Sequence, residues 1–192
     1  TFLGFGLMIP SNNVLTSSPF FDEGEVEPHR HFALSDGTYK GLLEFQYFNK
    51  TNYNPSFWGL KTELAMPITD SDYGYKAPYS YNITISTLFK LNSKSIVQPI
   101  GLSLGLSYLH TGEGYWGDQL DPTSKSTMLV PSIGGIWKLD DKGGISLSIQ
   151  RPFIIDGIGM GQENALNNEF DAIELMIGYR YTLDYVIPWL YF

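Results

Sequence analysis

The chain has 192 residues, of which 43% are hydrophobic, and this length suits a single domain. Its formal net charge of −8 excludes broad nucleic-acid binding, because that function requires a basic surface. Cysteine is absent, which excludes disulfides and thiolate metal sites, and no apolar window approaches the roughly 18 residues of a transmembrane helix.

Alternating apolar and polar residues predict eight strands in chain order. These strands span approximately residues 2–9, 40–49, 56–66, 81–91, 96–109, 126–139, 144–153 and 171–183. The fifth strand shows the pattern most clearly, since Leu102 and Leu104 alternate with Gly101 and Ser103. Strands of about 9–11 residues are long enough for a tilted membrane crossing.

The last predicted strand indicates how the sheet is solvated. Ile177 and Tyr179 fall on one face, whereas Glu174, Gly178 and Arg180 fall on the other. A soluble sandwich would bury the apolar face against a second sheet. A membrane barrel turns that face toward lipid and closes the sheet, so that no backbone polar group faces hydrocarbon unpaired.

The predicted connections alternate in length along the chain. Short links fall at residues 49–55, 92–95 and 140–143, and long links fall at residues 10–39, 67–80, 110–125 and 154–170. Outer-membrane barrels have short periplasmic turns and long extracellular loops. The sequence therefore predicts an all-β fold, a transmembrane antiparallel up-and-down β-barrel of eight strands that forms one domain over residues 1–192.

Two features bear on strand number and regularity. Asp36-Gly37 is typical of a two-residue hairpin, which would pair residues 28–35 with 38–46 in an extension above the membrane. Alternatively, two more strands exist, which would give ten strands instead of eight. Pro99 and Pro131 each remove a backbone donor from a predicted strand, so we expect a bulge or a rim position at each.

Charged side chains occupy the small-residue faces of three predicted strands. They are Glu44, Lys61, Glu63, Glu174 and Arg180. The interior of an eight-stranded barrel is just wide enough for side chains to fill it, so we expect these residues to form a network that plugs the lumen. A selective polar pore or a proton path is the alternative.

The loops contain weaker candidates for chemistry. His29 and His31 would point to the same side of an extended segment, which makes them weak candidates for metal ligands. Either histidine could instead act as a general base for a loop serine such as Ser35. Residues 112–121 combine acids, glycines and aromatics, which suits a divalent cation or a sugar. No catalytic set and no cofactor motif are predicted.

The alternation, the sorting of loops by length and the terminal Phe192 together resemble small bacterial outer-membrane barrels of the OmpX and OmpW type. The resemblance implies location in a Gram-negative outer membrane, with its lipids and lipopolysaccharide as neighbours. Arg151 lies on the apolar face beside Phe153, so we expect it to contact lipopolysaccharide phosphates, with a snorkelling side chain as the alternative. The loops or the tail at residues 185–192 would contact other outer-membrane proteins.

These features predict a non-enzymatic barrel that is a structural or accessory subunit of an outer-membrane assembly. The alternative is a channel for small hydrophobic or polar solutes. A third class, a lipopolysaccharide-modifying enzyme, would need His29 or His31 beside a serine and a carboxylate at the membrane rim. No signal peptide is recognisable in the first residues, which is expected of a mature form or of a chain that lacks part of its N-terminus.

Overall fold

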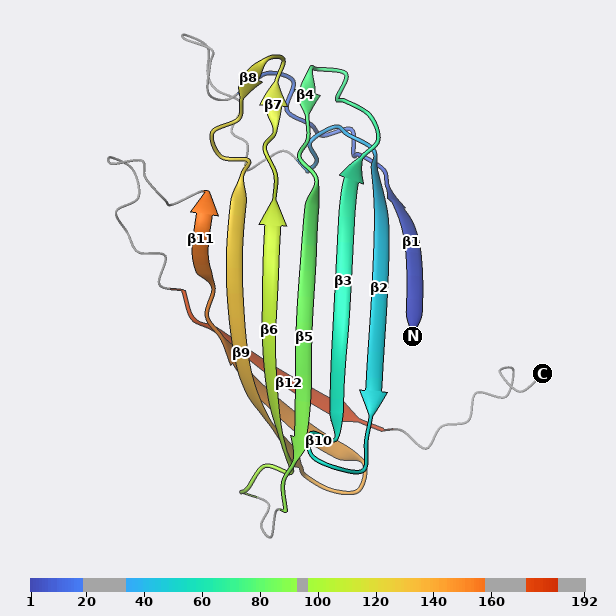
Figure 1. Cartoon of the computed structure of the whole chain (residues 1–192), viewed down its shortest axis with the longest axis vertical. Helices are drawn as coiled ribbons and strands as arrows, with labels where there is room; N and C mark the ends of the chain where they lie inside the picture. The colour runs from blue at the N-terminus through green and yellow to red at the C-terminus, as the bar shows by residue number, and fades with distance from the viewer. Residues whose placement is uncertain (19–33, 93–96, 158–171, 183–192) are drawn as a thin grey trace, which may run out of the picture.

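A single antiparallel sheet forms the body of the computed structural model, which describes residues 1–18, 34–92, 97–157 and 172–182 (Figure 1). Its strands, in spatial order, are β1 (Phe2–Met8), β2 (Lys40–Lys50), β3 (Phe57–Pro67), β5 (Ser80–Lys90), β6 (Gly101–Thr111), β9 (Ser126–Lys138), β10 (Gly143–Gln150) and β12 (Glu174–Tyr181). The eight predicted strands and their up-and-down order are thus confirmed. No helix long and apolar enough to cross a membrane lies in the part of the chain that the structure describes.

The last strand is shorter than predicted, at Glu174–Tyr181 and not 171–183, and two further differences in strand boundaries lie next to prolines. The fifth predicted strand begins at Gly101 and not near residue 96, so Pro99 lies just outside it, at the rim. The seventh is interrupted, because β10 ends at Gln150 and β11 (Phe153–Gly157) resumes against β9. The break at Arg151 and Pro152 lies opposite Pro131, where neither proline has an N–H to donate.

The bulge expected at Pro131 is found elsewhere. The Arg151 N–H donates to the Pro131 carbonyl at 3.2 Å, and the pairing register of the two strands is the same before and after the break. The register shifts instead between Ile154 and Asp156. The prediction of an irregularity at Pro131 was therefore right for the missing donor and wrong for the bulge.

The pairing expected between residues 28–35 and 38–46 is wrong over residues 40–46, and the ten-stranded alternative gains no support from this segment. Residues 40–46 pair with β1 on one side and with β3 on the other, so neither edge is left for residues 28–35. The described end of that segment lies against residues 11–14: Val14 and Ser35 form an isolated parallel bridge, and the Leu34 N–H donates to the Asn13 carbonyl at 2.9 Å. Residues 28–33 lie outside the described part of the chain.

The pairing register carries the sequence alternation across the whole sheet, because side chains on one face of a strand meet those on the same face of its neighbour. One face is small and polar: Glu44 faces Glu63, which faces Asn82. The other face is apolar and exposed. Its members from seven strands include Phe5, Leu43, Tyr47, Ile83, Ile85, Leu104, Leu106, Ile133, Ile149, Ile177 and Tyr179.

No second layer covers this apolar face in the described residues. Ile85 is 50% exposed and Ile133 is 51% exposed, although both lie in the middle of their strands. The buried apolar residues of the described chain are Tyr75 and Ala77, and both lie outside the main sheet. A water-soluble domain of this size would bury a large share of its Leu, Ile and Phe side chains.

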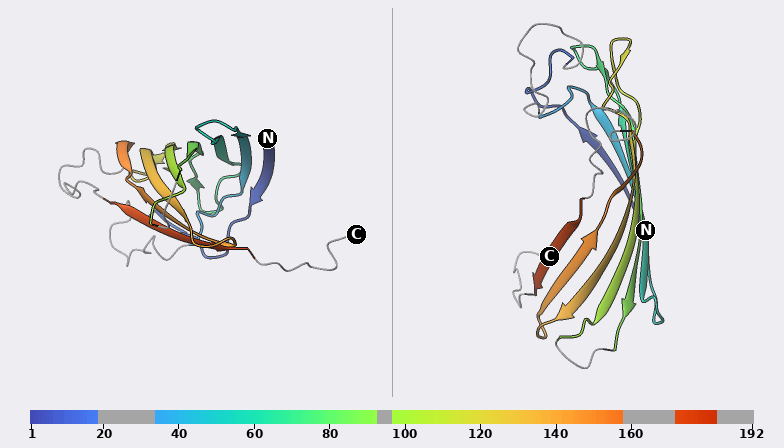
Figure 2. Two further views of the ribbon diagram at one scale, coloured as in Figure 1. Left: turned by 90° about the horizontal axis from the view of Figure 1, so that it is seen from below. Right: turned by 90° about the vertical axis from the view of Figure 1, so that its left-hand side faces the viewer.

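The sheet curls into a trough when it is viewed end-on, with β1 at one edge and β12 at the other (Figure 2). Small residues on the inner face permit tight curvature. At Gly134, for example, a Cβ would approach the Leu147 carbonyl at 2.8 Å and the Ser148 side chain at 2.9 Å. The described residues contain no pairing between β1 and β12, so the sheet is curled but not closed.

The two ends of the sheet differ as the loop lengths predicted. Short connections join β2 to β3 and β9 to β10 at one end, whereas the long connections lie at the other (Figure 1). Two long loops there form a separate small sheet from β4 (Tyr75–Lys76), β7 (Tyr115–Trp116) and β8 (Gln119–Leu120). We refer to this small sheet as the cap.

Candidate functional site

The inner face of the trough carries a polar network that begins on β3. The Lys61 ammonium contacts the Glu63 carboxylate at 2.9 Å, and the Asn82 amide donates to the same carboxylate at 3.1 Å. Glu44 lies directly opposite Glu63 on β2 and accepts a hydrogen bond from the Gln46 amide. Three of the five predicted lumen residues, Glu44, Lys61 and Glu63, are therefore brought together.

Hydroxyl groups extend this network along the inner face toward β6. The Thr84 hydroxyl donates to the Asn82 amide oxygen at 3.3 Å and lies 2.8 Å from the Ser107 hydroxyl. These residues meet because each occupies an inward position on its own strand and the strands pair without a shift. The alternation in the sequence thus predicts that these residues lie on the inner face, and the pairing of the strands determines which residues on neighbouring strands meet.

The charges on this part of the network do not balance. Glu44 and Glu63 carry two negative charges on adjacent strands, and Lys61 supplies one positive charge. Like charges directly opposite each other in an antiparallel pair are unfavourable unless a counter-charge or a donor lies between them. The Gln46 and Asn82 amides supply donors, but they supply no charge.

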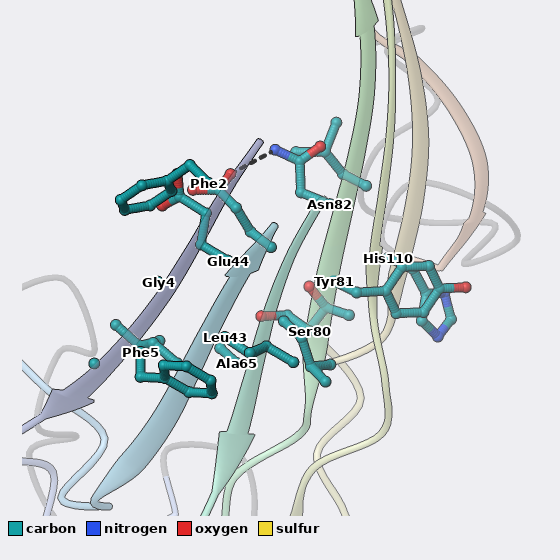
Figure 3. A pocket seen from close by; sticks show the side chains of 16 residues that line it. Phe2, Gly4, Phe5, Leu43, Glu44, Ala65, Ser80, Tyr81, Asn82 and His110 are labelled. Atoms are coloured by element: carbon teal, nitrogen blue, oxygen red, sulfur yellow. Dashed lines mark hydrogen bonds between the residues drawn. The ribbon is translucent and has the colours of Figure 1, made fainter. Parts of the chain in front are cut away.

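A cavity of about 550 Å³ lies beside this network, toward the long-loop end of β1, β2, β3, β5 and β6 (Figure 3). Glu44, Glu63 and Asn82 contribute polar groups to its lining, while Leu42 and Ala65 contribute apolar ones. The size and the mixed lining suit a small organic solute. The open edge of β1 forms part of the wall, since Phe2, Gly4 and Gly6 also line it.

The structure does not join the remaining two predicted lumen residues to this network. Glu174 accepts a hydrogen bond from the Gln150 amide at 2.5 Å, at one end of β12. Arg180 lies at the other end, beside a smaller cavity of about 340 Å³ that Lys142 and Gly178 also line. Both residues face inward as predicted, but β12 is the far edge of an open sheet.

An aromatic cluster that sequence reasoning did not single out as a site lies on the apolar face near the long loops. The rings of Tyr81 and Tyr108 stack at 5.8 Å, and His110 lies 5.0 Å from Tyr81. His110 Nδ1 is 2.9 Å from the hydroxyl of Thr127, which is 5% exposed. This cluster could have been predicted from the alternation of the sequence, which places all three rings on the apolar face beside a long loop.

Arg151 lies on the same face, as predicted from the sequence. Its guanidinium carbon is 5.1 Å from the centre of the Phe153 ring, a cation–π geometry that holds the charge against an apolar surface. The side chain is exposed at the level where β10 gives way to β11. This position suits contact with an anionic headgroup at a membrane interface.

Ion pairs lie among the loops at this end. Lys125 contacts Asp156 at 3.0 Å and Glu113 at 3.9 Å. The hydrogen bond from Lys125 is the main reason that the pKa of Asp156 lies below its usual value. Asp156 likewise raises the pKa of Lys125. Both groups are partly exposed, so we assign this ion pair a small contribution to stability.

The loop at residues 112–121, which suits a cation or a sugar by composition, is folded into the cap. Asp121 is 2% exposed, and its carboxylate accepts hydrogen bonds from the Thr123 N–H and hydroxyl, both at 2.9 Å. The Tyr75 hydroxyl donates to the same carboxylate at 3.3 Å. This carboxylate has a structural role in the loop.

The described ranges contain no group of three or more histidine, cysteine or acidic residues arranged to hold a metal ion. The weak metal candidates His29 and His31 lie outside the described residues, as does the tail at residues 185–192. The hydroxyl of Ser35, the serine suggested as a partner for those histidines, accepts a hydrogen bond from the Gly37 N–H at 3.3 Å and donates to the Ser11 carbonyl at 3.4 Å.

No family model matches the chain, and comparisons with curated proteins and with solved structures give no match either. The geometry of the sheet and the chemistry of its two faces are therefore the features that indicate a function.

Proposed function

We propose that this chain is a non-enzymatic β-barrel of the bacterial outer membrane, with a side-chain-filled interior, which acts as a structural or accessory subunit of a membrane assembly. One observation carries the proposal: a continuous apolar face runs across the whole sheet, and no layer formed by the described residues covers it. Lipid acyl chains are the environment in which such a face is stable.

The distribution of aromatic residues supports a membrane setting. On the apolar face, Tyr47 and Trp58 contact each other at 5.1 Å near the short turns. Tyr81 and Tyr108 stack near the long loops, at the other end of the same face. Amphipathic rings favour the two membrane–water interfaces, with aliphatic residues such as Ile85 and Leu106 between them.

The polar groups of the inner face favour an interior filled by side chains and disfavour a wide pore. Glu44, Lys61, Glu63 and Asn82 contact one another directly or through facing positions, and an eight-stranded barrel leaves little room beyond its side chains. The cap and Arg151 would then lie at the outer surface, where lipopolysaccharide phosphates and other proteins are available as partners.

Replacing Ile85 with Arg tests the proposal directly. Near the bilayer midplane, a lipid-facing Arg should lower the free energy of unfolding by about 2–4 kcal/mol. On a water-exposed face the same change should alter it by no more than about 0.5 kcal/mol. The measurement is urea unfolding in lipid vesicles, together with carbonate extraction of membranes to show that the protein is integral.

Tyr53→Arg is the matched control, because Tyr53 lies in a short turn and is 83% exposed. Tyr53→Arg should leave the free energy of unfolding unchanged whether the apolar face of the sheet contacts lipid or water. Recovery of the unmodified protein in the soluble fraction, or an Ile85→Arg variant as stable as the control, would remove the membrane proposal.

A second function, a channel for small solutes, is favoured by the cavity of about 550 Å³ with its acidic and apolar lining. The two functions differ in conductance. A filled interior should give negligible single-channel current in planar bilayers, whereas steady openings would establish the channel and exclude the plugged barrel.

A further inference from the structure

The two edges of the sheet create an unsolved hydrogen-bonding problem if the sheet lies in lipid. β1 and β12 each pair on one side only, so their outer backbone groups lack partners within the described chain. Each unpaired backbone group in hydrocarbon costs several kcal/mol, which is why open sheet edges are not found there. With eight strands in up-and-down order, the two edges run antiparallel and can pair with each other.

The register of the sheet shows how far the two edges are displaced. A row of facing residues can be followed from Glu174 through Gln150, Ser132, Gly105, Ser86 and Gly59 to Phe48. Phe48 lies two residues beyond Gln46, the partner of Phe2. Along these rows of facing residues, every residue of β12 therefore lies level with a position that precedes Phe2, so β12 and β1 do not overlap.

Closing a barrel requires a stagger of this kind, because tilted strands return to the first strand displaced along its length. Without displacement, Phe2 would face position 172, before β12 begins. Displacement of β12 by eight residues brings Phe2 opposite Arg180, Gly4 opposite Gly178 and Met8 opposite Glu174. All of β1 then faces residues of β12, with inward positions facing inward ones.

Neighbouring registers fit less well. A displacement of ten residues puts Phe2 opposite Thr182, which is outside β12, and leaves Glu174 and Leu175 without partners on β1. A displacement of six puts Met8 opposite position 172, which is also outside the strand. Displacements by an odd number would place inward residues opposite outward ones.

The same register resolves the unbalanced charge on the inner face. Arg180 would lie in the row of Phe2 and Gln46, two strands from β2, or about 10 Å between backbones. On β2, Glu44 is the next inward-facing residue after Gln46, and its partner on β1 is Gly4. Only Gly4 therefore lies between Glu44 and the closing strand. Gly4 has no side chain of its own, but the Phe2 ring lies over it, with Cε1 2.9 Å from the position of a Cβ. Once the Phe2 ring turns aside, the Arg180 guanidinium can reach toward Glu44.

We propose that β1 and β12 join in the Phe2–Arg180 register and that Arg180 neutralises the Glu44–Lys61–Glu63 cluster, so that the closing strand also seals the interior. This inference rests on the proposed membrane barrel and names the segment that completes it. It also explains why Arg180 lies apart from the Glu44–Lys61–Glu63 cluster in the open sheet, since only closure brings Arg180 to the cluster.

Disulfide mapping in isolated outer membranes tests the register, and the chain helps because it has no cysteine of its own. Phe5→Cys is combined in turn with Ile177→Cys, with Leu175→Cys and with Tyr179→Cys. Directly facing Cβ atoms lie about 4.5–5.5 Å apart, whereas diagonal ones lie about 7–8 Å apart. Mild oxidation should consume the free thiols of the Phe5–Ile177 pair and leave most of them in the other two pairs.

Every other outcome overturns the proposed seam. Selective crosslinking of the Leu175 or Tyr179 variant would assign a different register, and a covalent dimer would show that a second copy covers the edge. Absence of crosslinks in a protein that resists carbonate extraction would refute the seam while leaving the membrane proposal intact. Recovery of the unmodified chain in the soluble fraction would remove both.

A charge cycle tests the role of Arg180 independently. Arg180→Gln should lower the thermal unfolding midpoint in vesicles, and this loss should shrink when Glu44→Gln is present. Lys142→Gln is the matched control, because Lys142 lines the same small cavity as Arg180 but lies in a turn. An equal loss for Arg180→Gln with and without Glu44 would refute the proposed compensation.

Discussion

At the scale of single residues, the inner network depends on the pairing of Lys61 with Glu63. The two side chains are 38% and 41% exposed in the open trough, so the ion pair is only partly shielded from solvent. The Asn82 amide donates to the same carboxylate and fixes its position. A carboxylate held in this way is more costly to leave without its cation than to remove.

Lys61→Met should therefore lower the free energy of unfolding by about 1 kcal/mol, a size typical of such a contact. Adding Glu63→Gln should recover part of the loss, because the neutral amide oxygen can still accept from Asn82. Urea unfolding followed by tryptophan fluorescence measures both variants. A double variant less stable than Lys61→Met alone would contradict this account.

A second residue-scale feature lies where the chain enters β2. Asp36 accepts hydrogen bonds from the Thr38 hydroxyl at 2.8 Å and from the Thr38 N–H at 3.1 Å, and it also contacts the Lys40 ammonium. Burial alone would raise the pKa of Asp36, but Lys40 and Thr38 together hold this pKa below its usual value. The ionised form is therefore favoured in the folded state.

The sign of the pH effect follows from the lowered pKa of Asp36. Its contribution to stability is fully present above the unfolded value of about 3.9 and is lost as pH falls through the lower folded value. Asp36→Asn should thus be less stable than the natural protein near neutral pH, with a difference that shrinks below about pH 4. Urea midpoints across this range provide the measurement, and a constant difference would contradict it.

At the scale of elements, the continuation of β10 as β11 depends on a glycine at its end. Gly157 has φ of 95°, and a Cβ there would overlap the Lys125 carbonyl. Gly74 provides a matched comparison, since its φ is 84° but no atom lies within 4 Å of the Cβ position. The two sites therefore share the strain of a positive φ and differ in steric space.

Gly74→Ala should cost about 1 kcal/mol, from backbone strain alone. Gly157→Ala should cost at least about 1 kcal/mol more, because the backbone of Lys125 must also move. Unfolding midpoints of the two variants in vesicles measure the difference. Equal costs would show that β11 separates easily from β9 and that its pairing contributes little.

At the scale of the whole molecule, the two ends of the sheet differ, and under the proposed function this difference would set the orientation of the sheet in a membrane. The cap and the long loops lie at one end, and the short turns lie at the other (Figure 1). In an outer-membrane barrel, long loops are extracellular and short turns are periplasmic. The proposed function therefore assigns the cap to the outside of the cell.

An epitope inserted at Asp118, in the turn between β7 and β8, should accordingly bind antibody on intact cells. The same epitope at Tyr53, between β2 and β3, should bind only after the outer membrane is permeabilised. Both sites are exposed turns, so insertion should leave the fold intact at each. The reverse pattern of labelling would contradict the assigned orientation.

The sequence by itself determined the eight strands, the two faces of the sheet and the sorting of long and short connections. These features depend on local chemistry, because side chains alternate along each strand with a period of two whatever the strand pairs with. Ile85 and Asn82 could thus be assigned to opposite faces without knowing their neighbours. The inward orientation of Glu44, Lys61, Glu63, Glu174 and Arg180 follows from the same rule.

Only the tertiary structure decided which of these residues meet. Strand pairing places Glu44 opposite Glu63, brings the Asn82 amide to Glu63 and leaves Arg180 at the far edge. Two separate loops likewise meet to form the cap that buries Asp121. The register likewise places Pro131 opposite the break at Arg151 and Pro152, and this position cannot be predicted from either strand alone. Such contacts join residues distant in sequence, and a local pattern holds no information on register until the strands have paired.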